Sequence, residues 1–232
     1  MTRRQILVAS LSFTMIHISI APTPAPAPAP SPAPSEKVEE EPAPSVGDVA
    51  HFETRASHWG NEYTEYLDRQ PVRAPEGSVL TGFRLFRPSL ETLAYKGTSR
   101  VPLHCQLGPR HSARSNTTNT TNDHKNASAL THLRVCAPSG FALEYFRLVR
   151  PAKNSVAYEF SCRQVLTLGG APARVGPPVE HLGDWKRNDG SIIFLDRIGV
   201  PDCGSNNILV GFQRKSTSSH HRYMWITQAL LK

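Results

Sequence analysis

The strongest constraint on the fold of this 232-residue chain is a segment that occurs twice without a gap. Residues 72–88 read VRAPEGSVLTGFRLFRP and residues 135–151 read VCAPSGFALEYFRLVRP, so that 10 of 17 positions are identical. A weaker third copy, VPDCGSNNILVGFQRK, begins at Val200. Repeats of this kind bury their apolar faces against one another, which predicts three units of about 60 residues in one domain. The matching phenylalanines are 63 and 66 residues apart: Phe83, Phe146 and Phe212.

Each predicted unit has the pattern of β structure. A Pro-x-Gly turn at 75–77 and at 138–140 precedes a short run of alternating apolar and polar residues. Proline and glycine interrupt the chain too often for long helices. A second alternating stretch closes each unit, at Val101 and Leu103, Tyr158 and Phe160, and Tyr223 and Trp225. The sequence therefore predicts an all-β domain of three pseudo-symmetric repeats, β-trefoil-like or β-prism-like, with a two-sheet sandwich as the alternative.

The N-terminus has the features of a secretory signal peptide. Arg3 and Arg4 precede an uncharged run from Ile6 to Ala21, which is shorter than the roughly 20 apolar residues that span a bilayer. Residues 1–21 are therefore predicted to be a signal peptide rather than a membrane anchor. The protein is accordingly predicted to be secreted.

Residues 22–47 are predicted to form an extended linker. Nine of the 20 prolines lie between Pro22 and Pro44, first in the alternation APTPAPAPAPSPAP and then in the acidic stretch SEKVEEEPAPS. Proline at every second position favours a polyproline II conformation without a core of its own. The alternation resembles the hydroxyproline-rich, arabinogalactan-type glycomodules of plant and green-algal wall proteins. That resemblance implies an extracellular matrix or surface setting.

Three N-glycosylation sequons begin at Asn116, Asn119 and Asn126, in a stretch rich in Ser, Thr and Asn. Glycans are bulky and stay in solvent, so residues 108–130 are predicted to be a glycosylated surface loop. The predicted β domain then spans residues 48–232. Its repeats are expected at about 48–107, 131–164 and 180–232.

Four cysteines in an exported chain predict disulfide bonds. Cys136 and Cys203 open the second and third copies, whereas Cys105 and Cys162 follow the alternating stretches that close the first and second. Bridges between the end of one copy and the start of the next would be Cys105–Cys136 and Cys162–Cys203. They would leave one junction, between the third and first copies, without either partner. That single missing junction favours this pairing over the alternative Cys136–Cys162 bridge within one copy.

The sequence contains no common catalytic or metal-binding motif, such as a P-loop, Gly-x-Ser-x-Gly, His-Glu-x-x-His or Cys-x-x-Cys. The pair His220 and His221 is interpreted as the polar tip of a hairpin. Asp68 and Asp196 recur in Leu-Asp-Arg and are interpreted as ion-pair partners of the arginines that follow them. We therefore expect no cofactor, no bound metal and no enzymatic activity.

The basic residues carry the functional prediction. Residues 48–232 hold 23 Lys and Arg against 15 Asp and Glu, and 17 of the 23 are arginine, whose planar guanidinium binds sulfate, carboxylate or phosphate with two hydrogen bonds. Nucleic acid is not an expected partner of an exported chain. Acidic or sulfated polysaccharides and anionic membrane surfaces are. The repeat pairs the candidate polyanion-binding residues Arg84 with Arg147, and Arg87 with Arg150.

These features predict a non-enzymatic extracellular module that binds glycans or acidic polymers and is displayed on the proline-rich linker. Several equivalent weak sites would give avidity. The predicted architecture resembles that of threefold β lectins, although the sequence carries no lectin motif. The alternatives are a structural assembly subunit of a matrix, wall or surface appendage, bound to a matrix protein, and a secreted hydrolase. Peripheral contact with a membrane is compatible with the same basic charge.

Overall fold

The computed structural model divides into two units, Met1–Glu41 and Pro42–Lys232. The residues that the structure describes all lie in the second unit, and they are 47–58, 67, 70–119, 127–152, 154–187 and 192–231. The predicted signal peptide, the predicted linker up to residue 46, Asp68 and Asn126 lie outside the described residues. Among those that are described, no helix has the length and apolar character needed to cross a membrane.

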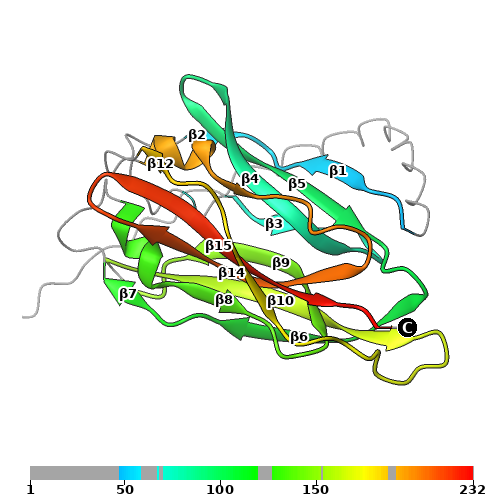
Figure 1. Ribbon diagram of the computed structural model, residues 1–232. Coiled ribbons are helices and arrows are strands. Elements are labelled where there is room, and N and C mark those ends of the chain that lie inside the picture. The colour runs from blue at the N-terminus through cyan, green and yellow to red at the C-terminus, as the bar shows by residue number, and fades with distance from the viewer. Residues whose placement is uncertain are drawn as a thin grey trace, which may run out of the picture. The chain divides into compact units, whose positions relative to one another are not determined.

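The described chain folds into antiparallel β-strands with two short 3-10 helices, which confirms the prediction of an all-β domain (Figure 1). The first sheet contains β1 (Ala50–Glu53), β2 (Ser57–His58), β4 (Val79–Ser89), β5 (Thr92–Arg100) and β13 (Gly199–Val200). The second contains β3 (Val72–Arg73), β6 (Cys105–Arg114), β7 (Thr118–Asn119), β9 (Phe141–Val149) and β10 (Ser155–Thr167). The third contains β8 (Arg134–Cys136), β11 (Val179–Leu182), β12 (Lys186–Arg187), β14 (Asn207–Ser216) and β15 (His220–Ala229). The helices are η3 (Ala127–His132) and η4 (Ile192–Arg197).

The three sheets exchange short strands with one another. Each sheet is built on one long hairpin, β4–β5, β9–β10 or β14–β15. The short strand that precedes one hairpin in the chain pairs with a different hairpin: β3 with β9, β8 with β14, and β13 with β4. The described strands therefore lie in three interlocked sheets, and the alternative of a two-sheet sandwich is wrong.

The exchanged strands dock at a β-bulge in each hairpin. The register of the three hairpins shifts around Thr81, Glu144 and Val210. The carbonyl oxygen of each of these residues accepts a hydrogen bond from the segment that enters from elsewhere: from the amide of Cys203 at 3.0 Å, Ala74 at 2.9 Å and Ala137 at 2.8 Å. A bulge twists its strand and frees a backbone group from the ladder, and here that group holds the neighbouring segment.

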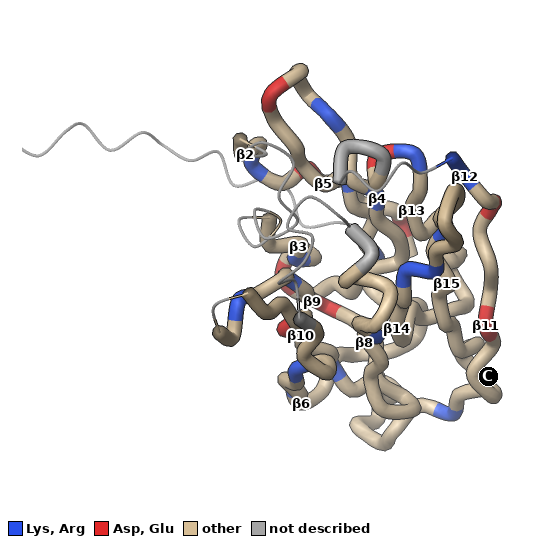
Figure 2. The backbone as a smooth tube through the Cα atoms, turned by 90° about the vertical axis from the view of Figure 1, so that its left-hand side faces the viewer, with Lys and Arg blue, Asp and Glu red and all other residues tan. Residues whose placement is uncertain are grey.

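The core lies where the three hairpins meet, and Figure 2 shows the three sheets arranged around this interior. The rings of Phe83, Phe146 and Phe212 form a triangle with centroid distances of 4.6, 4.7 and 4.7 Å. Three buried tyrosines surround the triangle, and each contacts two of the phenylalanines: Tyr95, Tyr158 and Tyr223. Edge-to-face aromatic contacts of this kind add to the free energy gained from burying the rings.

The prediction from the sequence placed the second strand of the first hairpin too far along the chain. That strand is β5, which contributes Leu93 and Tyr95 to the core, whereas Val101 and Leu103 follow it and lie outside the strands. The prediction aligned Cys105 with Cys162, but the residue that matches Cys162 in the hairpin register is Ser99. The predicted loop at 108–130 also begins as a strand, because residues up to Arg114 belong to β6 and pair with β10.

Candidate functional site

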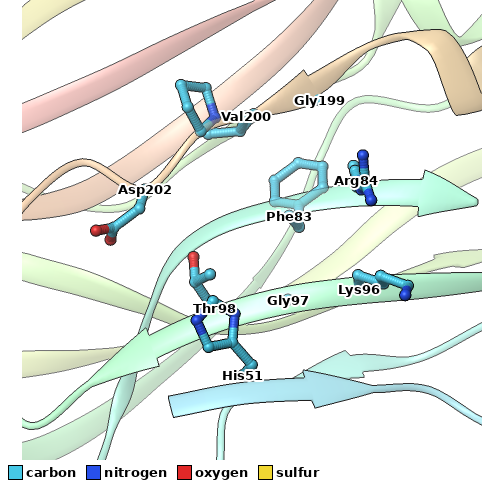
Figure 3. Close-up of a pocket in the computed structure, with 10 residues that line it drawn as sticks. His51, Phe83, Arg84, Lys96, Gly97, Thr98, Gly199, Val200 and Asp202 are labelled. Atoms are coloured by element: carbon cyan, nitrogen blue, oxygen red, sulfur yellow. The ribbon is translucent and has the colours of Figure 1, made fainter. Parts of the chain in front are cut away.

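A pocket of about 430 Å³ lies against the first sheet, and we call it the Arg84 pocket (Figure 3). Phe83 and Leu85 face the core, so the alternation of the strand turns Arg84 outward. Strands β5 and β1 add Lys96, Thr98 and His51, and the exchanged strand β13 and the residues after it add Val200, Pro201 and Asp202. The pocket therefore combines strands β1, β4 and β5 with the segment at β13, which is distant from them in the sequence.

Arg84 and Lys96 are directly opposite each other in the β4–β5 register. Like charges at such positions repel, and Lys96 is held by Glu53, whose carboxylate oxygen lies 2.7 Å from the ammonium nitrogen. Among the described residues, Arg84 has no carboxylate partner within ion-pair distance. Arg84 thus presents an exposed guanidinium whose charge no carboxylate of the described residues balances.

Asp202 is the carboxylate of the Arg84 pocket, and its charge is compensated by Arg100. The Nη2 atom of Arg100 donates to Asp202 Oδ2 at 2.6 Å. Burial raises the pKa of Asp202, but the hydrogen bonds from Arg100 and Thr81 outweigh burial and lower the pKa below its usual value. Asp202 is therefore an ionised, paired group near neutral pH, and an anion in the pocket would bind on the side of Arg84.

The structure brings the predicted residues Arg84 and Arg87 together. Both line a second pocket of about 470 Å³ with Phe86, Leu90 and Asp196. The Nε atom of Arg87 donates to Asp196 Oδ2 at 2.7 Å, so the predicted local partner of Asp196, the arginine that follows it, is replaced by an arginine from the first hairpin. Arg84 belongs to both pockets and is their shared cation.

The other two predicted arginines lie on the second sheet. Arg147 matches Arg84 in the hairpin register, but its partner across the strands is Glu159, to which it donates hydrogen bonds at 2.9 and 3.1 Å. Arg150 follows β9 and is exposed. In the third sheet the matching cross-strand pair is neutral, Gln213 and Met224. Of the three matching pairs, the one in the first sheet joins two cations.

A third basic pocket, of about 390 Å³, was missed by the sequence analysis. Arg73, Arg110 and Arg114 line it together with Tyr145. Arg110 donates two hydrogen bonds to Glu144, at 2.7 and 2.8 Å, and these hydrogen bonds outweigh the effect of burial and lower the pKa of Glu144. Arg110 and Arg114 lay in the predicted glycosylated loop; their even spacing in the sequence, which places both on one face of a strand, was the available signal.

All four cysteines are free thiols in the structure, so the predicted Cys105–Cys136 and Cys162–Cys203 bridges are not formed. Cys105 begins the edge strand β6, whereas Cys162 lies fully buried in the middle of β10. The two residues are therefore not equivalent ends of a repeat, and the argument from a single missing junction fails.

The thiols should differ strongly in reactivity. Cys136 is exposed, whereas burial raises the pKa of Cys162 to about 11 and that of Cys203 to about 12. Because the thiolate is the reactive form, we expect iodoacetamide at pH 8 to label Cys136 first in the folded protein. Peptide mass spectrometry would measure the order, with the unfolded, unreduced protein as a control that yields four labelled thiols. Fewer than four would show that bridges exist.

The glycosylation sites stay a prediction. Asn116 is exposed and follows β6, and Asn119 ends the short strand β7. Asn126 lies outside the described residues. The exposure of Asn116 is what a glycan needs.

Within the described ranges, no group of three or more His, Cys, Asp or Glu side chains is placed to hold a metal ion. No protein-family model matches the chain, and searches of the curated proteins and of the solved structures find no match. The function is therefore inferred from the chemistry of the pockets.

Proposed function

We propose that residues 48–232 form a β-prism-like binding domain with three pseudo-symmetric repeats, and that it binds an acidic extracellular polysaccharide at the Arg84 pocket. Three features support the architecture: the cyclic exchange of short strands, the three matching bulges and the triangle of phenylalanines. Their equivalence around one interior is what a threefold repeat needs to bury its apolar faces.

The observation that carries the binding proposal is the opposed pair of cations, Arg84 and Lys96. The second sheet replaces this pair by an ion pair and the third by neutral side chains, so the repulsion is not required by the fold. An anionic group at Arg84 would accept charge-assisted hydrogen bonds from its guanidinium, and Lys96, which is held by Glu53, would add a further donor. Sulfate and carboxylate groups on a polysaccharide have this chemistry.

The shape of the site favours a polar polymer over a membrane. The Arg84 pocket is concave, and Thr98, whose hydroxyl accepts a hydrogen bond from Thr81, and the paired Asp202 line it together with the cations. These groups can bind the hydroxyls that accompany each acidic group of a polysaccharide, whereas a flat anionic lipid surface does not need them. Each pocket described above contains one carboxylate, while two-carboxylate glycoside hydrolysis needs a pair. Binding therefore fits the described residues better than hydrolysis.

Replacing Arg84 tests the proposal directly. We expect Arg84→Ala to weaken binding of the full chain to heparin by about 10-fold to 100-fold, the range for a hydrogen bond to a charged group, and Arg84→Glu to weaken it further. Isothermal titration calorimetry at physiological salt would measure both.

The matched control is Arg174→Glu, which makes the same charge change at an exposed arginine outside the three basic pockets described above. It should bind like the unaltered protein. Equal losses for Arg84→Glu and Arg174→Glu would contradict a defined site and indicate non-specific attraction by net charge. Binding of the unaltered chain to anionic vesicles but not to heparin would contradict the choice of a polysaccharide.

A further inference from the structure

A pocket of about 350 Å³ lies beside the Arg84 pocket, and we call it the Trp225 pocket. Gly199 and Pro201, in and directly after β13, line both pockets. A Cβ atom on Gly199 would lie 2.8 Å from the Cβ atom of Arg84 and 3.0 Å from the carbonyl oxygen of Phe83. The absence of a side chain at Gly199 thus lets β13 lie close to β4, and this short segment separates the two pockets.

The Trp225 pocket has a different chemistry from its neighbour. The indole of Trp225 is partly buried, and His181 stacks on it with a centroid distance of 5.5 Å and an interplanar angle of 16°. His181 Nε2 is in turn hydrogen-bonded to Thr227 Oγ1 at 2.8 Å. The indole is therefore held in one orientation by a second ring, which is itself fixed.

Polar groups surround this aromatic ring. The exposed side chains of Asp184 and Lys186 lie at the pocket, and the ammonium of Lys186 is 3.7 Å from the carboxylate of Asp184. Gly183 also lies next to the indole, since a Cβ atom on it would meet Trp225 Cζ3 at an ordinary contact distance of 3.5 Å. An oriented aromatic surface beside an acid and a base suits a sugar ring, which has an apolar C–H face and hydroxyl groups at its edge.

The aromatic ring distinguishes the third sheet from the first. Trp225 is opposite Phe212 in the β14–β15 register, and the residues that match it are Gly97, opposite Phe83, and Phe160, opposite Phe146. Tryptophan thus occupies this position in the sheet whose pocket adjoins the opposed cations across β13. The first sheet supplies charge and the third supplies an apolar surface.

We propose that the two pockets are adjoining subsites for one acidic oligosaccharide, which crosses the protein over Gly199 and Pro201. An acidic unit binds at Arg84 and Lys96, and the next part of the chain places an uncharged face of a sugar ring against Trp225. This inference rests on the proposed function and adds to it that the ligand is a chain of several sugars. An isolated anion or monosaccharide would fill one subsite and bind weakly.

The test uses heparin fragments of defined length, from disaccharide to decasaccharide, titrated into the full chain by calorimetry at low and at high salt. We expect the affinity to rise with length and then to level off once both pockets are filled. Trp225→Ala should lower the affinity for the long fragments by a factor of about five to ten. It should leave the affinity for the disaccharide unchanged. The contribution of Trp225 to the affinity should change little between low and high salt, because the contact is apolar. The contribution of Arg84 to the affinity should fall at high salt, because salt screens charges.

Two further variants keep the test independent of folding. Trp225 packs against the core, so the double variant Asp184→Ala with Lys186→Ala, which alters two exposed side chains, serves as the second disruption and should also reduce the rise. Trp185→Ala removes an exposed indole that Arg222 covers at 4.1 Å and should leave the rise intact. Affinity that does not depend on length, or a full rise in both disrupted variants, would overturn the two-subsite proposal alone. Absence of heparin binding at every length would overturn the proposed function with it.

Discussion

Phe146→Ala should lower the free energy of unfolding by about 3–5 kcal/mol, the range for removing a buried aromatic ring. The ring is 1% exposed and lies 4.6 Å from Phe83 and 4.7 Å from Phe212, measured between centroids. It also contacts Tyr95 and Tyr158. Each hairpin contributes one ring to this centre, so the cavity left by alanine would open between all three sheets. The backbone of three interlocked sheets cannot easily close such a cavity.

Equilibrium unfolding of the full chain in urea, followed by tryptophan fluorescence, would measure this loss. The matched control is Leu90→Ala, because Leu90 is a large apolar side chain that is 84% exposed, and its removal should change the free energy of unfolding by less than about 0.5 kcal/mol. Phe83→Ala and Phe212→Ala should cost about as much as Phe146→Ala if the three positions are equivalent. A cost for Phe146→Ala no greater than that for Leu90→Ala would contradict the central position of the ring.

The features of the fold that were predictable from the sequence are those that depend on local patterns of apolar and polar residues. The repeat aligned Phe83, Phe146 and Phe212 with one another in the sequence, and the structure places their rings together at the centre. The position of β5 was not predictable in the same way. The alternation of its buried apolar residues, Leu93 and Tyr95, stops at Gly97. The ring of Phe52 from β1 fills the space that a side chain at Gly97 would need. A glycine that a distant residue covers breaks the local pattern.

The positions of the cysteines did not predict the contacts between the repeats, for a related reason. Their order along the chain suggested bridges between repeats, but a disulfide needs Cβ atoms about 3.8 Å apart, and sequence order does not supply that proximity. The register places Cys105 at the start of an edge strand, opposite Thr167, and Cys162 at an interior position, opposite Leu143 and His111. Strand register depends on contacts between distant segments, which an even number of cysteines does not reveal.

Only some residues of the candidate site could be predicted from the sequence. Arg84 and Arg87 stood out because the repeat and their residue type marked them. Lys96 became relevant only when the register placed it opposite Arg84, and Asp202 only when β13, which precedes the β14–β15 hairpin, joined the first sheet. The exchange of short strands thus builds the pocket as well as the core. A pocket formed in this way combines residues that no single hairpin contains.

Gly211→Ala tests that exchange. A Cβ atom at Gly211 would lie 2.1 Å from the carbonyl oxygen of Val135 in β8 and 2.9 Å from the Cα atom of Cys136. Both contacts are with backbone, so β8 would have to move away from β14 and its pairing would be strained. We expect a loss at or above the upper end of the about 1–3 kcal/mol that overpacking costs, because the hydrogen bond from Ala137 to the bulge at Val210 would be strained as well.

Urea unfolding of the full chain would again measure the effect, with Gly176→Ala as the matched control. A Cβ atom at Gly176 would meet its nearest neighbour, the Cβ atom of Ala229, at an ordinary distance of 3.7 Å. The control makes the same chemical change in a loop that contacts the same hairpin, and its stability should stay close to that of the unaltered protein. Equal stability of the two variants would show that β8 does not lie against Gly211. A loss confined to Gly211→Ala would support the strand exchange from which the Arg84 pocket is also built, since β13 approaches Gly82 in the first sheet in the same way, with Val200 O 2.7 Å from the position of its Cβ atom.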